Sequence, residues 1–212
     1  MNRADQRARD ERLMRRAIAV AQAMLGRTWP NPVVGCVVAQ GDDIVSEAST
    51  APGGRPHAEE QALDLAGARA RGATVYVSLE PCGERSSGAA SCSERLAAAG
   101  VARVLIAADN PEPLSAGRGV ERLREAGIEV EAGFLAEEAE PLYRAFRHKL
   151  QTGLPLVETA ASGEGFDGLF APAPGEALET ALRRLGREGY TRLWVPERSE
   201  HALELKSLGF LI

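Results

Sequence analysis

Hydrophobic and polar positions along the chain follow patterns that predict helices and strands in alternation. Apolar residues recur at helical spacing from residue 9 to 26, and Gly26 is placed to end that helix. Short β-rich runs at 33–39 and 44–45, joined by a Gly-Asp-Asp turn, predict a β-hairpin. Beyond the hairpin, the patterns predict strands at 74–79, 101–107 and 128–130, and helices at 57–70, 92–100, 119–126 and 135–149.

This alternation with short connections predicts a layered α/β domain with parallel strand pairing, which we expect to occupy residues 1–150. Residues 110–119 are rich in Pro and Gly and follow a strand end, where α/β proteins place ligand loops.

The pattern weakens in the tail, residues 151–212. Residues 158–177 have little periodicity and much Gly, Ala and Pro, which predicts an irregular linker. A helix at 178–187, a strand at 192–195 and a helix at 200–208 complete it. We expect this small α/β unit to lack a core of its own and to pack on the first domain or on a second subunit.

Composition excludes several classes of protein. The 212 residues are 44% hydrophobic, enough for one core with a small appendage. The net charge of −5 is interspersed, so no basic surface points to nucleic acid. The amino terminus is charged without an apolar segment, and no run is long enough to span a bilayer, so we expect a cytoplasmic protein with no membrane partner. Three cysteines without a secretion signal favour metal ligation or burial over disulfides, and Cys36 is expected in the core.

Four residues predict a catalytic zinc site. His57 and Glu59 belong to the sequence His-Ala-Glu, Cys82 follows Pro81 after a strand, and Cys92 begins a helix. One imidazole and two thiolates leave a fourth tetrahedral position open for water, whereas closed structural sites use four protein ligands. Zinc lowers the pKa of bound water to about 7, and Glu59 is placed to carry protons, as hydrolytic deamination requires. His-x-Glu and Pro-Cys match the signature of zinc nucleobase deaminases, but the gap between the cysteines is far longer than the usual two residues.

Five ordered segments make residues 12–150, roughly, resemble the deaminase domain of the bifunctional riboflavin-biosynthesis deaminase/reductase, of the cytidine deaminase-like superfamily. They are MRRAIAVAQAMLGRTWPNPVVGCVV (14–38), PHAEEQAL (56–63), GATVYVSLEPC (72–82), AAGVARVLIA (98–107) and AGIEVEAGFL (126–135). The resemblance implies a three-layer α/β/α fold with a mixed central sheet. It implies zinc ligands and a proton shuttle at His57, Cys82, Cys92 and Glu59, and we expect substrate contacts at Asn31, Ala58, Arg85 and Asn110.

The implied substrate is a diamino-pyrimidinone that carries a ribosyl-amino phosphate, but three loops depart from the family pattern. The loop between the cysteines is one residue longer and lacks a histidine, Asn-Pro-Glu-Pro at 110–113 replaces Asp-Pro-Asn-Pro, and Ala-Ser-Thr at 48–50 replaces Gly-Trp-His. Two alternatives therefore stay open: a deaminase of another amino-heterocycle, with or without a phosphate, and a non-catalytic zinc-binding relative, against which the retained Glu59 argues. Asn31 would serve equally well to stabilise its turn. Arg55, Arg85 and Arg118 are candidates for a phosphate, though no motif places them.

The tail resembles a remnant of a reductase domain. Residues 146–157 are similar to the junction into that domain, and residues 189–198 are similar to its late strand. Pro196, Glu197 and Arg198 stand where a glycine pair would approach the cofactor phosphate, and neither a proline nitrogen nor a carboxylate donates the hydrogen bonds that a phosphate needs. We therefore expect one zinc ion per chain and no NADPH. Because this fold class is commonly dimeric or tetrameric, we also expect a homo-oligomer that acts on a small molecule.

Overall fold

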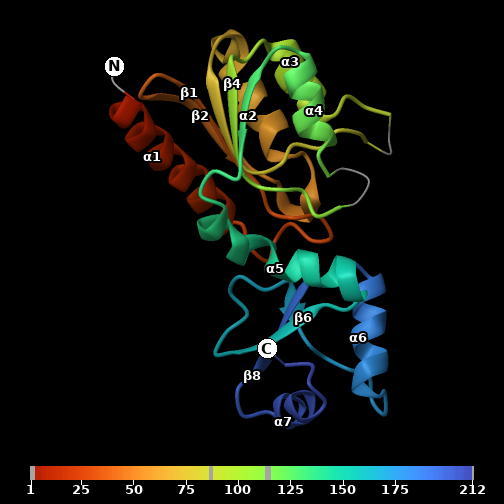
Figure 1. The fold of residues 1–212 in the computed structure, drawn as a ribbon. Helices are drawn as coiled ribbons and strands as arrows, with labels where there is room; N and C mark the ends of the chain where they lie inside the picture. The colour runs from red at the N-terminus through yellow and green to blue at the C-terminus, as the bar shows by residue number, and fades with distance from the viewer. Residues whose placement is uncertain (1–2, 86–87, 113–115, 212) are drawn as a thin grey trace.

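The computed structural model describes residues 3–85, 88–112 and 116–211, which form a larger and a smaller α/β part (Figure 1). The larger part contains a five-stranded sheet in the order β2-β1-β3-β4-β5. Its strands are β1 (Gly35–Gln40), β2 (Asp43–Ser49), β3 (Thr74–Leu79), β4 (Arg103–Ala108) and β5 (Glu129–Ala132). β1 pairs antiparallel with β2 and β3, whereas β3 with β4 and β4 with β5 pair in parallel. The expected hairpin and the mixed sheet are confirmed.

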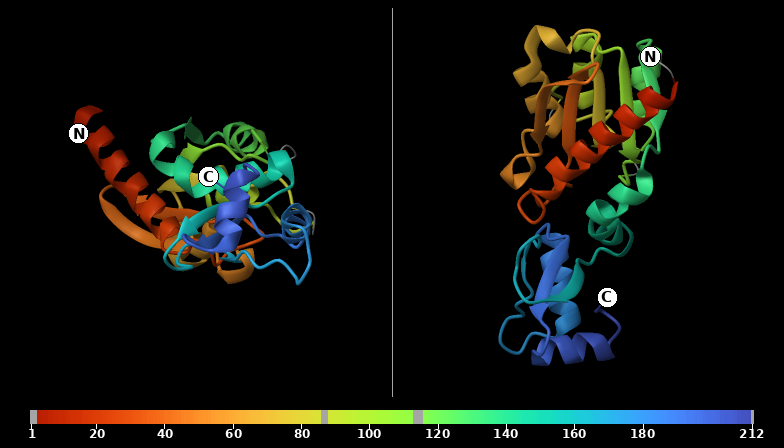
Figure 2. Two further views of the ribbon diagram at one scale, coloured as in Figure 1. Left: turned by 90° about the horizontal axis from the view of Figure 1, so that it is seen from below. Right: turned by 90° about the vertical axis from the view of Figure 1, so that its left-hand side faces the viewer.

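Helices cover both faces of this sheet, which confirms the three-layer α/β/α architecture (Figures 1 and 2). α1 (Arg3–Gln22) and α5 (Ala136–Thr152) lie on one face, where they also contact each other. α2 (Ala58–Ala66), α3 (Cys92–Ala99) and α4 (Arg118–Glu125) lie on the other. The buried stripe of α1 includes Leu13, Met14 and Ala17, the spacing expected of a helix that packs on a sheet.

The core lies on both faces of β3 and β4, whose residues are buried along most of their length. Such continuous burial is typical of parallel strands covered by helices. Cys36 is fully buried in β1, as expected. One charged group enters this core: Asp10 of α1 is 2% exposed, and its carboxylate accepts hydrogen bonds of 2.6 Å from Tyr76 and Arg103. This network fastens α1 to β3 and β4.

Several predicted boundaries shift. α1 begins six residues earlier than expected, with charged and largely exposed turns, and it ends at Gln22, so that Gly26 lies in the following turns. The predicted helix 57–70 is divided into α2 and a 3₁₀ turn, Gly67–Ala70, and His57 precedes α2 as its N-cap. Short 3₁₀ turns at helix ends are common, and they account for this difference.

The tail forms a three-stranded parallel sheet in the order β6-β8-β7, built from β6 (Leu156–Ala160), β7 (Gly168–Leu169) and β8 (Arg192–Pro196). α6 (Leu178–Arg187) and α7 (Glu200–Ser207) agree with the predicted helices. The prediction of an irregular linker over 158–177 is wrong in part, because the end of β6 and all of β7 lie within it. Gly168 and the Gly-rich flanks hid the two-residue β7 from any periodicity argument.

The expectation that the tail lacks a core was also wrong. Ten buried side chains, among them Val157, Phe170 and Leu193, form a cluster separate from that of the larger part. The core arises because strands from both sides of the predicted linker pair with each other, which composition could not show. α5 runs through residue 150, so the division into 1–150 and 151–212 stays a prediction. None of the described helices is long and apolar enough to cross a membrane.

Candidate active site

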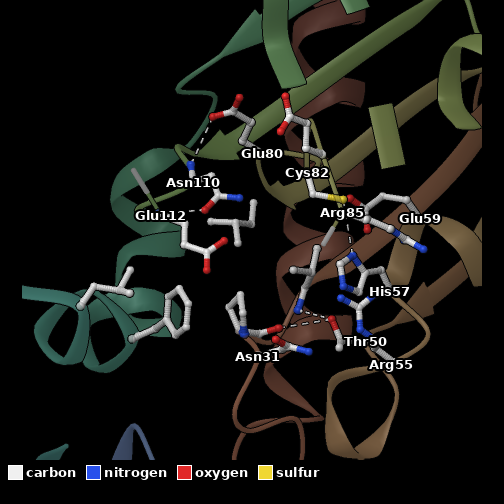
Figure 3. Close-up of a pocket in the computed structure, with 16 residues that line it drawn as sticks. Asn31, Thr50, Arg55, His57, Glu59, Glu80, Cys82, Arg85, Asn110 and Glu112 are labelled. Carbon is white, nitrogen blue, oxygen red and sulfur yellow. Dashed lines mark hydrogen bonds between the residues drawn. The ribbon is translucent and has the colours of Figure 1, made fainter. Parts of the chain in front are cut away.

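The site lies at the carboxyl edge of the parallel strands. β3 ends at Leu79 and delivers Cys82 three residues later, and β4 ends at Ala108, two residues before Asn110. Because parallel strands end at a common edge, the residues that follow them meet there, as in other α/β proteins. The N-termini of α2 and α3 bring His57 and Cys92 to the same place, and Figure 3 shows His57 beside Cys82.

His57, Cys82 and Cys92 form a cluster that fits a zinc ion. Their ligand atoms all lie within 4.8 Å of one another. Nδ1 of His57 lies 3.3 Å from Sγ of Cys92 and 3.8 Å from Sγ of Cys82. Tetrahedral zinc places its nitrogen and sulfur ligands about 3.5 Å apart. The donor set of two thiolates and one imidazole therefore matches zinc in both chemistry and spacing, and it leaves one coordination position for a small molecule.

Backbone hydrogen bonds hold the two cysteines in place. The Cys92 N–H donates to Sγ of Cys82 at 3.3 Å, and the N–H and hydroxyl of Ser93 both donate to the Cys82 carbonyl, at 3.2 and 3.1 Å. Ser91 caps α3, since its hydroxyl accepts from the Glu94 N–H. Helix N-termini favour thiolates. The pKa of the Cys82 thiol is lowered, because the Cys92 side chain, the His57 ring, the Cys92 N–H and the Arg85 guanidinium all favour its thiolate form.

Glu59 lies two residues after His57 and opens onto the same pocket. Its residue is 2% exposed, and Oε2 has no hydrogen-bond partner among the described residues. Burial raises the pKa of this carboxyl above its ordinary value. A buried carboxylate oxygen without a partner is costly, and this one lies beside three residues that could hold a metal ion.

The pocket in front of the cluster has a volume of about 750 Å³. Figure 3 shows Asn110 and Glu112 on one side and Asn31, Thr50 and Arg55 on the other, with His57 and Cys82 between them. Phe146 and Leu150 of α5 add an apolar wall. An apolar cavity with a few convergent polar groups is the usual form of a small-molecule site.

The predicted substrate residues are not equivalent in the structure. Asn31 and Asn110 line the pocket. The side-chain amide of Asn31 donates to the Gly54 carbonyl at 3.1 Å, which leaves its Oδ1 for a ligand. Oδ1 of Asn110 accepts from the Glu112 N–H at 3.0 Å. Ala58 is fully buried as the first residue of α2, and its side chain does not line the pocket.

The three arginines considered as phosphate ligands differ in their ion-pair partners and in whether they line the pocket. Arg85 lines the pocket, but its guanidinium is held by the Glu60 carboxylate at 2.7 Å and donates to Sγ of Cys92 at 3.4 Å. The pairing lowers the pKa of Glu60 to about 2 and raises that of Arg85. Arg118 pairs with Glu84 at 2.7 Å and does not line this pocket. Arg55 lines the pocket and is exposed.

Glu80 was missed by sequence reasoning. It is 4% exposed, and its carboxylate accepts four backbone hydrogen bonds, from Asn110 and Gly117 to one oxygen and from Gly119 and Val120 to the other. It thereby caps α4 and holds the loop that carries Asn110. A side chain at Gly119 would collide with the Pro81 carbonyl, because an ideal Cβ there lies 2.0 Å from that oxygen. The only clue in the sequence was a carboxylate directly after a buried strand.

Comparison with known proteins agrees with this geometry. Residues 7–108 match the family described as "Cytidine and deoxycytidylate deaminase zinc-binding region". The chain is 44% identical over 168 residues to the riboflavin biosynthesis protein RibD of Escherichia coli (strain K12), a match that covers 79% of this chain and 45% of that protein. It is 39% identical over 185 residues to RibD of Bacillus amyloliquefaciens, which covers 86% of this chain and 49% of that protein.

Solved structures give the same result. Acinetobacter baumannii RibD (form 2) is similar with a TM-score of 0.68 and 42% identity, over 81% of this chain and 48% of that one. A diaminohydroxyphosphoribosylaminopyrimidine deaminase/5-amino-6-(5-phosphoribosylamino)uracil reductase from Thermotoga maritima is similar with a TM-score of 0.68 and 34% identity, over 80% and 47% of the two chains. The chain thus spans about half the length of the relatives it matches. The chain therefore carries, over residues 7–108, the zinc-binding region of the cytidine and deoxycytidylate deaminase family, and it is similar to RibD proteins over most of its length.

Proposed function

We propose that this protein is a zinc-dependent deaminase that hydrolyses the amino group of an amino-pyrimidine. The default substrate is the diaminohydroxyphosphoribosylaminopyrimidine named for the Thermotoga maritima relative. The observation that carries the proposal is the unpartnered, buried Oε2 of Glu59, which opens onto a pocket beside three zinc ligands. A non-catalytic zinc protein would gain nothing from such a costly group.

The proposed reaction replaces a ring C–NH₂ by C=O, consuming one water and releasing one ammonia. His57, Cys82 and Cys92 would hold the zinc ion, which when bound supplies a nucleophile from water at neutral pH. Glu59 would take a proton from that water at Oε2 and deliver it to the leaving amine, as general acid/base catalysis requires. Arg85, fixed by Glu60, would donate a hydrogen bond to Sγ of Cys92 and so partly offset the negative charge of that thiolate.

Recognition would come from both sides of the pocket. Asn31 presents Oδ1 to the amino groups of the heterocycle, and Asn110 lies opposite. Arg55 would bind a phosphate, since Arg85 is engaged by Glu60 and Arg118 lies outside the pocket. The contact expected from Ala58 would have to come from its backbone, because the side chain is buried.

A second candidate is a deaminase of another amino-heterocycle, and one observation favours it. The three loops that depart from the family pattern all reach the pocket, where Thr50, Glu84, Asn110 and Glu112 line it. The Thr50 hydroxyl is already engaged, since it accepts from the Val34 N–H at 3.0 Å and donates to the Pro32 carbonyl. Changes in the loops that line the pocket, around unchanged candidate zinc ligands, are expected of a deaminase that acts on a different substrate.

The remaining expectations are also proposals. We propose that the tail binds no NADPH, which is supported by Pro196, a residue without an N–H, at the end of β8 and by Ser199, which already caps the N-terminus of α7. A cytoplasmic location, a homo-oligomer and the lack of a nucleic-acid partner stay predictions.

Ammonia release by the purified, zinc-loaded chain tests the proposed function. The pathway pyrimidine is the first substrate, with cytidine, guanine and adenine in parallel and the Glu59→Gln protein as the control. Rapid release from the pyrimidine that vanishes in the variant would support the default substrate. Release from another heterocycle alone would favour the second candidate, and no release from any of them with zinc bound would refute catalysis on these compounds.

A further inference from the structure

The tail contacts the larger part at one side of the pocket, next to Asn31. The ring of Tyr190 stacks on that of Trp29, with centroids 4.5 Å apart and planes inclined by 20°. Trp29 is two residues before Asn31. Pro30 lies between these two residues, and Gly189 packs directly on Pro30. An ideal Cβ at residue 189 would lie 2.8 Å from Cβ of Pro30. Only a residue without a side chain fits this contact, at a φ of 107°.

Tyr190 is itself fixed by the tail. Its ring packs against the tail core, and its N–H donates to the Leu185 carbonyl of α6 at 3.1 Å. The next residue, Thr191, donates from both its N–H and its hydroxyl to one carboxylate oxygen of Asp167, each at 2.7 Å. Lys149 of α5 reaches the Gly189 carbonyl at 3.1 Å. These contacts hold the ring of Tyr190 in place against Trp29.

The segment that receives this support, residues 26–32, is also anchored within the larger part. The Thr28 hydroxyl donates to the Asn31 carbonyl at 3.1 Å, and the Thr50 hydroxyl donates to the Pro32 carbonyl at 3.4 Å. The Asn31 N–H donates to the Thr28 carbonyl at 3.1 Å, and the Gly53 N–H donates to the Arg27 carbonyl at 2.9 Å. Asn31 is held to Gly54 by its side-chain amide. Gly26 approaches the backbone of Phe166 in the tail, where an ideal Cβ would lie 2.3 Å from a carbonyl oxygen. The tail thus contacts this segment at its first residue, Gly26, and in its middle, at Trp29 and Pro30.

We propose that the tail is a positioning element for the substrate: through Tyr190 and Gly189 it fixes the segment 26–32 and so sets where Asn31 meets the heterocycle. The proposal deepens the proposed deaminase function and rests on it. It assigns to a reductase-like remnant a role in the deaminase reaction, with no cofactor of its own. Tyr190 is a positioning residue, because it acts through Trp29 and Asn31 and does not line the pocket.

The test compares three variants of the full, zinc-loaded chain. Tyr190→Ala removes the stacked ring and should raise KM for the amino-pyrimidine by about two- to tenfold, the range that a lost aromatic pair supports, with kcat changed less. Tyr190→Phe keeps the ring and should restore the wild-type KM. Leu203→Ala, at a 69% exposed position of α7, alters the tail outside its core and should leave both KM and thermal stability unchanged.

Hydrogen exchange provides a readout that does not depend on turnover. In Tyr190→Ala, the amides of Asn31 and Gly53 should exchange faster, while those of β3 stay protected. Unchanged exchange and an unchanged KM in Tyr190→Ala would overturn the positioning role, as would an equal rise in KM in Leu203→Ala. If the wild-type protein releases no ammonia, the proposed function fails, and exchange at Asn31 still decides whether Tyr190 holds the segment.

Discussion

Replacing Glu80 tests how the loop that carries Asn110 is held beside the pocket. Glu80→Gln keeps the shape of the side chain but replaces one carboxylate oxygen by an NH₂ group. Each oxygen accepts two backbone hydrogen bonds, at 3.1 and 3.3 Å for Oε2 and at 3.1 and 3.2 Å for Oε1. The new NH₂ group is a donor and cannot accept hydrogen bonds from the two backbone N–H groups that it faces. The substitution also removes the negative charge at the start of α4.

The magnitude follows from these contacts. A hydrogen bond to a charged group contributes about 1.5–3 kcal/mol, and two of the four are lost in the variant. The interaction of the charge with the N-terminus of α4 adds about 0.3–1 kcal/mol. We therefore expect the free energy of unfolding to fall by about 3–7 kcal/mol. Because the loop with Asn110 and Glu112 lines the pocket, kcat/KM should fall by about 10- to 100-fold, as expected when a binding group is displaced by an ångström.

Urea denaturation at a fixed zinc concentration measures the stability, and hydrogen exchange at Asn110, Gly117, Gly119 and Val120 localises the effect. Glu125→Gln is the matched control: it removes a carboxylate from the exposed last turn of the same helix and should change stability by no more than about 0.5 kcal/mol. If Glu80→Gln behaves like this control and the four amides exchange as in the wild type, the carboxylate does not hold the loop.

Three further outcomes are expected. Glu59→Gln should keep zinc, measured by atomic spectroscopy, and lose at least about a hundredfold in turnover; loss of the metal would contradict its assignment as the proton shuttle. Cys92→Ala should release zinc and lower the melting temperature, because the ligands join the starts of two helices, and a fully active, zinc-loaded variant would disprove the ligand role. Arg55→Ala should raise KM about tenfold for a phosphorylated substrate and leave the dephosphorylated one unaffected, with Arg118→Ala as the control; equal effects on both substrates would exclude a phosphate contact.

The sequence predicted the elements whose burial follows a regular period. β3 and α6 match their predicted ranges, because a β-rich run that ends at Glu80-Pro81 and an amphipathic stripe leave little choice of boundary. β7 was missed because a two-residue strand has no period at all. The tail core escaped prediction for a related reason: its strands are separated in sequence, and only their pairing in space creates a surface large enough to bury.

Some residues of the candidate site could likewise be predicted from the sequence, and others could not. The grouping of His57, Cys82 and Cys92 was predictable, since metal ligands have to meet. Arg85 was expected to contact substrate, but the structure shows its charge paired with Glu60, a residue 25 positions earlier in the chain. No local pattern reveals such a pairing. Glu80 was overlooked because its partners are backbone groups, which have no signature in the sequence.

The hydrogen bonds that join Cys92 and Ser93 to Cys82 clamp the two ends of the intervening loop. The loop has nine residues between the cysteines, one more than the family pattern. Once its ends are fixed, one additional residue costs only about 0.1 kcal/mol of closure entropy. The length of the loop is thus nearly a free variable for natural selection, whereas Arg85 and Ser91 within it stay tied to Glu60 and to the start of α3.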